Sequence, residues 1–207
     1  MITYRNATND DLNGIAKLHK LCFKEYFLTS LGVNLLGKYY KEYLNEGAPF
    51  VVAENDENEI IGFCMGYQDA TTQARKNFES NNKIRLAIRL FFLCCAFNKN
   101  AWVRVIAKIK SIFRRAKHRK DPVKKNNISN TVGSLLSICL DSKYRGTDIA
   151  KTLVIKFEDE LKAKGIEEYT LSVYSTNARA RAFYEKTGFN FHCEEGDSVI
   201  YIKTLQE

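Results

Sequence analysis

Residues 143–152 read KYRGTDIAKT and join two segments of different pattern. The preceding residues 135–141, LLSICLD, form a short apolar run that is typical of a buried strand. The following residues 150–165, AKTLVIKFEDELKAKG, have the apolar spacing of a helix and end at a glycine. A glycine-containing loop at a helix N-terminus presents backbone N–H groups to an anion. Asp148 brings a carboxylate to the same place, so the stretch raises the question of whether the loop still binds an anion.

A second motif, STNARARAFYEKTGF at 175–189, follows the strand-like segment EEYTLSVY and predicts a short helix. The whole chain reads strand, helix, helix, strand, strand, an insertion, and then strand, helix, strand, helix, strand, strand. This alternation indicates a mixed α/β sheet. The expected elements are a strand at 2–8, helices at 11–23 and 35–45, two strands within 49–67, a strand at 131–141, a helix at 147–164, a strand at 167–174, a helix at 177–189, and a hairpin that turns near 195–197. Thr8 and Asp11 predict a capping box before the first helix.

The two motifs together resemble the GNAT superfamily of acetyl-CoA-dependent N-acetyltransferases. The resemblance covers roughly residues 1–68 and 131–205 and is strongest over 136–189. It implies a mixed, mostly antiparallel central sheet flanked by helices. We therefore expect a single acetyltransferase-like domain over 1–207, with a basic helical insertion at about 70–130 between the third and fourth strands.

The resemblance also implies where acetyl-CoA binds. The fourth strand would part from the fifth and offer free backbone groups to the pantetheine amides, and the following loop would wrap the pyrophosphate at a helix N-terminus. Tyr184 would protonate the leaving thiolate as general acid, after direct attack of an amine on the thioester. The implied cofactor-binding residues are Ile138, Cys139, Leu140, Arg145, Gly146, Thr147, Asp148, Ile149, Ala150, Asn177 and Tyr184.

Several of these residues have simpler interpretations. Asn177 opens a helix and is also a good N-cap residue. Tyr184 is also consistent with a core aromatic, and Ile138 and Leu140 would lie in the core of any α/β protein. Asp148 departs from the family pattern, R/Q-x-x-G-x-G/A, in which its position is a glycine. We expect acetyl-CoA binding to persist but to be weaker than with glycine, because the carboxylate opposes the phosphate charge.

The acceptor and the general base are less defined by sequence. A small-molecule primary amine is expected, and an amino sugar is one class that the resemblance suggests. Residues 23–32 are a candidate wall of the acceptor site, and Glu25, Glu54 and Asp69 are candidate bases, each of which is also consistent with a surface charge. The alternative function is a degenerate GNAT domain that binds CoA, or nothing, and serves as an adaptor at a membrane or protein surface.

The basic charge of the chain is concentrated in one segment. Residues 75–125 hold 16 of the 32 lysines and arginines but only two of the 24 acidic residues. Within this segment, 83–97 and 101–120 have helical spacing, and Trp102, Ile109 and Phe113 share an apolar face. Three interpretations remain open: a hairpin packed on the sheet, an interfacial helix pair on an anionic membrane through 83–120, and a site for nucleic acid or an acidic partner. No RNA-binding motif supports nucleic acid.

The composition also bears on secretion, on the redox state of the cysteines and on metal binding. The first residues, MITYRNATNDD, have no apolar secretory region. The six cysteines have no CxxC spacing, which favours reduced thiols in a cytoplasmic protein, peripheral at the inner face of the membrane if the insertion binds lipid. The three histidines are scattered, and we predict no metal site.

Overall fold

The structure is a computed structural model that describes residues 1–24, 26–68, 73–95 and 132–205. The chain divides into two compact units, one formed by Met1–Phe78 with Ser129–Glu207 and the other by Glu79–Ile128. The larger unit carries the sheet. The described part of the smaller unit consists mainly of helix α5 (Lys83–Cys95), and helix α4 (Ala74–Asn81) crosses the boundary between the units. The predicted helix at 101–120 lies outside the described residues.

The elements of the larger unit follow the predicted order. Its first part contains β1 (Thr3–Asn6), η1 (Asn9–Asp11), α1 (Leu12–Cys22), α2 (Phe27–Ser30), α3 (Val33–Asn45), β2 (Phe50–Glu54) and β3 (Ile60–Tyr67). Its second part contains β4 (Val132–Leu140), η2 (Ser142–Tyr144), α7 (Ile149–Ala163), β5 (Glu168–Tyr174), α8 (Ala178–Lys186), β6 (Asn190–Glu195) and β7 (Ser198–Thr204).

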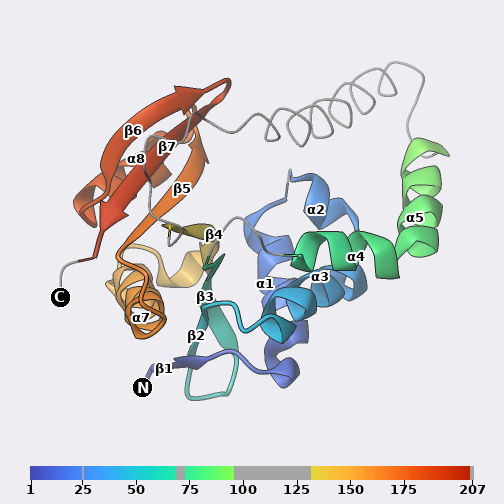
Figure 1. Cartoon of the computed structure of the whole chain (residues 1–207). Coiled ribbons are helices and arrows are strands. Elements are labelled where there is room, and N and C mark those ends of the chain that lie inside the picture. Colours follow the sequence, from blue (N-terminus) through green and yellow to red (C-terminus); the bar gives the residue numbers. More distant parts are fainter. Residues whose placement is uncertain (25, 69–72, 96–131, 206–207) are drawn as a thin grey trace. The chain divides into compact units, whose positions relative to one another are not determined.

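The seven strands form one sheet in the order β1-β2-β3-β4-β5-β7-β6 (Figure 1). Every neighbouring pair is antiparallel except β4 and β5, which are parallel. The predicted fold, a mostly antiparallel sheet flanked by helices with the insertion after the third strand, is therefore confirmed.

Helices cover both faces of the sheet. Helices α1 and α3 pack on one face and α7 on the other (Figure 1). We call the first contact layer the α1/α3 core; it includes Ile15, Tyr40 and Phe63. The second, the α7 core, includes Phe157 and Tyr169. Because β2 and β3 lie between the two cores, their residues are buried almost without alternation.

Close packing of β3 on β4 depends on a glycine. A Cβ at Gly66 would lie 2.1 Å from the Ser134 carbonyl oxygen, so no larger residue fits without moving the backbone. At this point Met65 is opposite Ser137 and Gly66 is opposite Leu135, which leaves Leu136 as a β-bulge.

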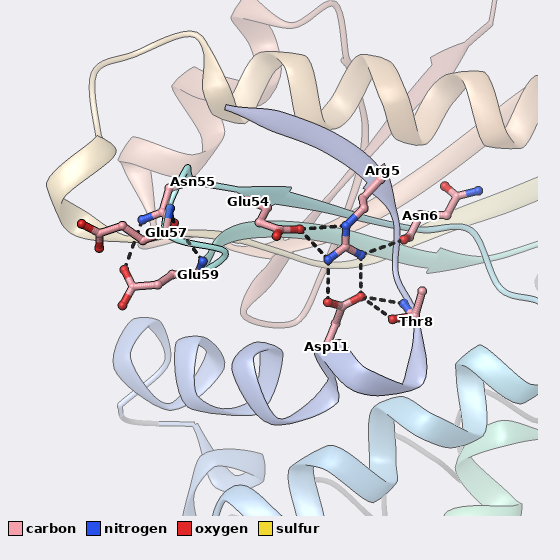
Figure 2. A network of polar contacts seen from close by, with 8 residues as sticks. All are labelled: Arg5, Asn6, Thr8, Asp11, Glu54, Asn55, Glu57 and Glu59. Carbon is pink, nitrogen blue, oxygen red and sulfur yellow. Dashed lines mark hydrogen bonds and ion pairs between the residues drawn. The ribbon is translucent and has the colours of Figure 1, made fainter. Parts of the chain in front are cut away.

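An ion network ties β1 to β2 and to the start of α1 (Figure 2). The Arg5 guanidinium donates to both Asp11 carboxylate oxygens at 2.7 and 2.8 Å and to Glu54 at 2.8 Å. Asp11 also accepts from the Thr8 N–H and hydroxyl, and the predicted capping box is present. Burial acts to raise the pKa of the Asp11 carboxyl, but the hydrogen bonds from Arg5 and Thr8 outweigh burial and hold the pKa below its usual value.

Candidate active site

Strands β4 and β5 are paired along only part of their length. Val132 lies opposite Glu168, and the ladder ends where Leu135 lies opposite Leu171. We call residues 132–135 the inner half of β4 and residues 136–140 its outer half. The outer half still pairs with β3, and residues 172–174 of β5 still pair with β7. The sheet therefore opens between these two segments, and their facing backbone groups are left for another partner.

The bulge at Leu136 lies where the opening begins. Beyond it, β4 alternates between the two cores: Ile138 and Leu140 pack against the α7 core, whereas Cys139 belongs to the α1/α3 core. The three residues proposed for pantetheine, Ile138, Cys139 and Leu140, thus all lie on the outer half.

The loop after β4 leads to the N-terminus of α7. Asp141 caps the short helix η2 by accepting from the Lys143 N–H at 3.0 Å. Gly146 has φ of 84°, and no atom lies within 4 Å of a Cβ built on it, so the backbone conformation and not crowding favours glycine there. The Thr147 hydroxyl donates to the Tyr144 carbonyl at 2.6 Å.

Asp148 is the N-cap residue of α7, but its carboxylate makes no capping hydrogen bond. The side chain is exposed, and no hydrogen bond or ion pair links it to another described residue. The N–H groups of the first helical turn are therefore not satisfied by this side chain, although its charge remains beside them. Arg145 is exposed on the same loop.

Tyr184 and Asn177 belong to the segment after β5. Tyr184 is 8% exposed and packs against Phe189 and Tyr201, and its hydroxyl has no hydrogen bond within the described part of the chain. Burial raises the pKa of Tyr184 well above its usual range, so the phenol keeps its proton. Asn177 is exposed and accepts from the Ala180 N–H at 3.1 Å, so it acts as the N-cap of α8.

Aromatic side chains connect the segment 23–32 to the end of β5. The Tyr26 and Tyr174 ring centroids are 5.8 Å apart, and Phe23 lies 5.2 Å from Tyr26. Burial, and then the neighbouring Tyr174, raise the pKa of Tyr26. Sequence reasoning pointed to 23–32 but not to Tyr174, because a contact between residues so far apart in the chain has no local signal.

Two thiols meet at the outer half of β4: Cys139 belongs to the strand, and Cys22 reaches it from α1. The Cys22 thiol donates to the Leu140 carbonyl at 3.4 Å. Hydrogen bonding with the Cys139 thiol lowers the pKa of Cys22, burial opposes this shift, and the Arg145 charge adds to it. Burial raises the pKa of Cys139 well above its usual value. Sequence analysis placed Cys139 here but not Cys22, which reaches β4 only through the packing of α1.

Of the three candidate bases, the structure describes only Glu54. Glu54 is held by Arg5 at the β1 side of the sheet, which makes it a structural ion pair (Figure 2). Glu25 and Asp69 lie outside the described residues. Within residues 1–24, 26–68, 73–95 and 132–205, no group of His, Cys, Asp or Glu side chains could hold a metal ion.

Strands that separate before a glycine-containing loop are also what the family resemblance predicted. A family model described as acetyltransferase (GNAT) family matches residues 12–189. The chain belongs to the acetyltransferase (GNAT) family.

A curated relative in this family is spermidine N(1)-acetyltransferase of Thermoplasma acidophilum, which is 35% identical over 72 residues. The match covers 35% of this chain and 45% of that protein, so this chain spans less than half of the relative's length.

Solved structures share the whole fold. PH1933 from Pyrococcus horikoshii OT3 aligns with a TM-score of 0.61 at 19% identity, covering 100% of both chains. The PaiA N-acetyltransferase of Thermoplasma acidophilum, solved in complex with coenzyme A, aligns with a TM-score of 0.55 at 17% identity, covering 99% of both chains. At these identities the likeness concerns the fold alone.

Proposed function

We propose that this GNAT protein transfers an acetyl group from acetyl-CoA to a primary amine of a small molecule by direct attack in a ternary complex. The observation that carries the proposal is the opening between β4 and β5 beside the N-terminus of α7. Backbone groups on the outer half of β4 can bond amides of an extended ligand, and a helix N-terminus favours a phosphate.

The residues present fit acetyl-CoA with one exception. Ile138, Cys139 and Leu140 offer the unpaired strand edge, and residues 145–150 offer the loop and the first N–H groups of α7. The Asn177 oxygen is used in capping, which leaves its amide nitrogen for the cofactor arm. The exception is the exposed Asp148 carboxylate, which opposes a phosphate without blocking it sterically. Acetyl-CoA would supply the activated thioester carbonyl.

Tyr184 supplies the proton in this proposal. The Tyr184 side chain is largely buried and protonated, and its hydroxyl makes no hydrogen bond to described residues, so its hydrogen is available for a new acceptor. A hydrogen bond to sulfur strengthens as negative charge develops there, which lowers the barrier selectively.

The expected acceptor is a cationic or hydrogen-bonding amine. The β6–β7 hairpin carries Glu194, Glu195 and Asp197. Its tip adjoins β5, since Tyr174 lies opposite Ser198 and the Ser175 N–H donates to the Asp197 carbonyl at 2.9 Å. These carboxylates favour a polyamine, as does the name of the Thermoplasma relative. Amino sugars remain the second acceptor class to test.

The direct test is release of free thiol from acetyl-CoA with a panel of amines that includes spermidine, monoamines and nucleotide-linked amino sugars. Amine-dependent thiol release, with acetylated amine detected by mass spectrometry, supports the enzyme. Absence of turnover across the panel, together with measurable CoA binding by calorimetry, supports the adaptor alternative. The exposed Asp148 at the helix N-terminus is the observation that favours that alternative.

The smaller unit adds a proposed membrane partner. Helix α5 exposes Ile84 (76%) and Ile88 (51%) one turn apart, next to exposed Arg85 and Arg89. Exposed apolar side chains beside cations favour the interface of an anionic bilayer and support a proposed location at the inner face of the membrane. Among the described residues, no helix is both long and apolar enough to cross a membrane.

Vesicle binding tests this partner. Wild-type protein should co-sediment with vesicles containing phosphatidylserine at low salt and dissociate as salt rises, because screening weakens the attraction. Ile84→Ser with Ile88→Ser should weaken binding. The emission of Trp102, the one tryptophan in the sequence, should shift to the blue if the segment 101–120 also enters the bilayer. Well-folded wild-type protein that stays in the supernatant at low salt would reject the partner.

A further inference from the structure

A buried phenol on β7 joins helix α8 to the sheet. Tyr201 is fully buried, and its hydroxyl donates to the Glu185 carboxylate at 2.6 Å. The same oxygen accepts from the Arg181 Nε at 3.3 Å. A buried hydroxyl costs free energy unless it is hydrogen-bonded, and the ring of a phenylalanine would fill the same space without that cost. The Tyr201 hydroxyl and its two charged partners on α8 therefore call for an explanation.

Helix α8 has little apolar packing of its own. Tyr184 is the one residue of this helix that is buried, and its other side chains are exposed or only partly buried. Polar contacts tie the helix at its two ends. The Arg181 Nη1 donates to the Ser175 carbonyl at 3.3 Å, and the Lys203 Nζ donates to the Thr187 carbonyl at 2.8 Å. Hydrogen bonds therefore contribute much of what places α8 on the sheet.

The two partners of Tyr201 lie on either side of Tyr184 in the sequence. Arg181 and Glu185 are four positions apart and so lie one turn apart on the same face of the helix. Because one hydroxyl bonds both residues, it limits the rotation of α8 about its own axis as well as its distance from β7. A rotation would move the far end of the Tyr184 side chain more than its backbone. The Tyr184 and Tyr201 rings also pack together, with centroids 6.3 Å apart.

Strand register relates Tyr201 to the opening in the sheet. Tyr201 lies opposite Leu171 on β5, and Leu171 lies opposite Leu135, where the β4–β5 ladder ends. All three side chains belong to the α7 core, as does Tyr184. Tyr201 thus holds α8 from the row of the sheet that directly precedes the outer half of β4.

We propose that Tyr201 is a positioning residue for acetyl transfer: its hydroxyl, held between Arg181 and Glu185, sets the place of the Tyr184 hydroxyl beside the opening of the sheet. The inference rests on the proposed function, in which Tyr184 is the general acid. Proton transfer needs the donor and the acceptor to be within hydrogen-bond reach and aligned. A displaced Tyr184 would remain buried and protonated, but it would meet the thioester sulfur less often in that geometry.

Tyr201 itself takes no part in the chemical step. The amine nitrogen bonds the thioester carbonyl carbon, the carbon–sulfur bond breaks, and the sulfur keeps the electron pair and takes the Tyr184 proton. The proton that the amine loses returns to the Tyr184 phenolate by way of water. The two hydrogen bonds of Tyr201 are the same before and after this step, so their effect is on placement alone.

The test measures single-turnover acetyl transfer from acetyl-CoA to spermidine, or to the fastest amine of the panel if another is faster. It compares Tyr201→Phe, Tyr184→Phe and the double variant in the full-length protein. Tyr201→Phe should lower the rate constant by roughly 10-fold, because the acid is less well placed, with Kd for acetyl-CoA unchanged by calorimetry. In the Tyr184→Phe background the same substitution should have little further effect, because Tyr201 acts through Tyr184.

Glu185 provides variants that leave the core intact, because its side chain is exposed. Glu185→Ala removes the acceptor of the Tyr201 hydroxyl and should lower the rate constant about as much as Tyr201→Phe. Glu185→Gln keeps an acceptor oxygen and should restore most of the activity. These variants test the same contact if Tyr201→Phe does not fold.

A matched control separates positioning from stability. Tyr169 is buried in the same core, and its hydroxyl also donates to a carboxylate, that of Glu158, at 2.5 Å. Tyr169→Phe should lower stability but keep the rate constant. The proposal fails if folded Tyr201→Phe or Glu185→Ala is as active as wild type, if their loss multiplies with that of Tyr184→Phe, or if Tyr169→Phe loses as much activity. If wild type turns over no amine of the panel, the proposed function fails, and this inference fails with it.

Discussion

The two halves of β4 have similar apolar sequences but different surroundings. All four residues of the inner half, 132–135, are paired with β5, and Ser134 and Leu135 are paired with β3 as well. The outer half, 136–140, is paired with β3 alone, and the bulge at Leu136 marks the change. In the proposed function, one strand thus serves first as core and then as a binding edge. The comparison teaches that this site depends less on special side chains than on where a ladder ends.

The two halves of β4 also differ in the groups that lie next to them. An unpaired backbone group in a protein interior needs a partner, and a ligand with amides can supply one. Helix α1, which carries Cys22, and helix α7 both contact β4, and the Cys22 thiol donates to the Leu140 carbonyl. The inner half is enclosed by apolar side chains such as Leu161 and Ile166, which contact the position of Gly133.

The largest expected effect separates two buried tyrosines of the α7 core. Tyr184→Phe should lower kcat by roughly 10²–10⁴-fold if Tyr184 is the general acid, with little change in thermal stability because its hydroxyl has no bond to lose among described residues. Tyr169 lies on β5, and its hydroxyl donates to Glu158 at 2.5 Å. Tyr169→Phe should show the reverse pattern, lower stability by about 1 kcal/mol with kcat retained. Unchanged kcat in Tyr184→Phe, with chemistry limiting turnover, would remove Tyr184 from the mechanism.

A pH effect probes His19, a buried side chain on α1 whose Nδ1 lies 2.6 Å from the Tyr40 hydroxyl oxygen. The pKa of His19 is about 4 in the folded protein, against about 6.5 when unfolded, so the unfolded chain binds more protons between these values. Stability should therefore fall by about 3 kcal/mol as pH drops from 7 to 4. The Asp11 contribution is lost only at lower pH, because its folded pKa is depressed. Urea unfolding across this range tests the slope, which His19→Gln should flatten, with exposed His192→Gln as the control.

Two glycines at opposite ends of α7 give a smaller, paired effect. Gly146 and Gly165 have φ of 84° and 71°, and neither has an atom within 4 Å of an added Cβ. Alanine at either position should cost about 1–2 kcal/mol of stability, because both conformations are left-handed. Only Gly146→Ala should also weaken acetyl-CoA binding, because only Gly146 lies in the loop at the open edge. Equal loss of affinity in both variants, measured by calorimetry, would contradict the placement of the phosphate.

The smallest expected effect concerns Asp148. Asp148→Asn removes a charge at nearly constant shape and should tighten acetyl-CoA binding roughly fourfold, since a well-solvated charge about 5 Å from a phosphate costs near 1 kcal/mol. Asp148→Gly should also bind more tightly but lose some stability. Asp159→Asn removes the same charge farther along α7 and is the control. Unchanged affinity in both Asp148 variants would show that the carboxylate does not sense the ligand.

Local patterns predicted the elements well. The apolar period of α1 and α3, the Thr8–Asp11 capping box and the loop before α7 all depend on residues within a few positions of one another. The order of helices and strands along the chain followed from these elements, and the mostly antiparallel sheet followed from the family resemblance.

The details of the site depended on contacts between distant residues. Glu54 was a candidate base from sequence, but Arg5, 49 residues away, holds it. The contact of Tyr26 with Tyr174 and the hydrogen bond between His19 and Tyr40 arise only when α1, α3 and the sheet pack together. Nor does any local signal tell where the β4–β5 ladder ends, because strand register is set by tertiary packing.

Amide-resolved hydrogen exchange by NMR, with and without acetyl-CoA, tests the central claim most directly. The account predicts that acetyl-CoA slows exchange of amides in the outer half of β4 and at the start of α7, while amides of the inner half, which already faces β5 as a paired strand, change little. Protection of both halves alike, or binding that leaves residues 136–140 unchanged, would contradict the claim that the open edge of β4 holds the cofactor.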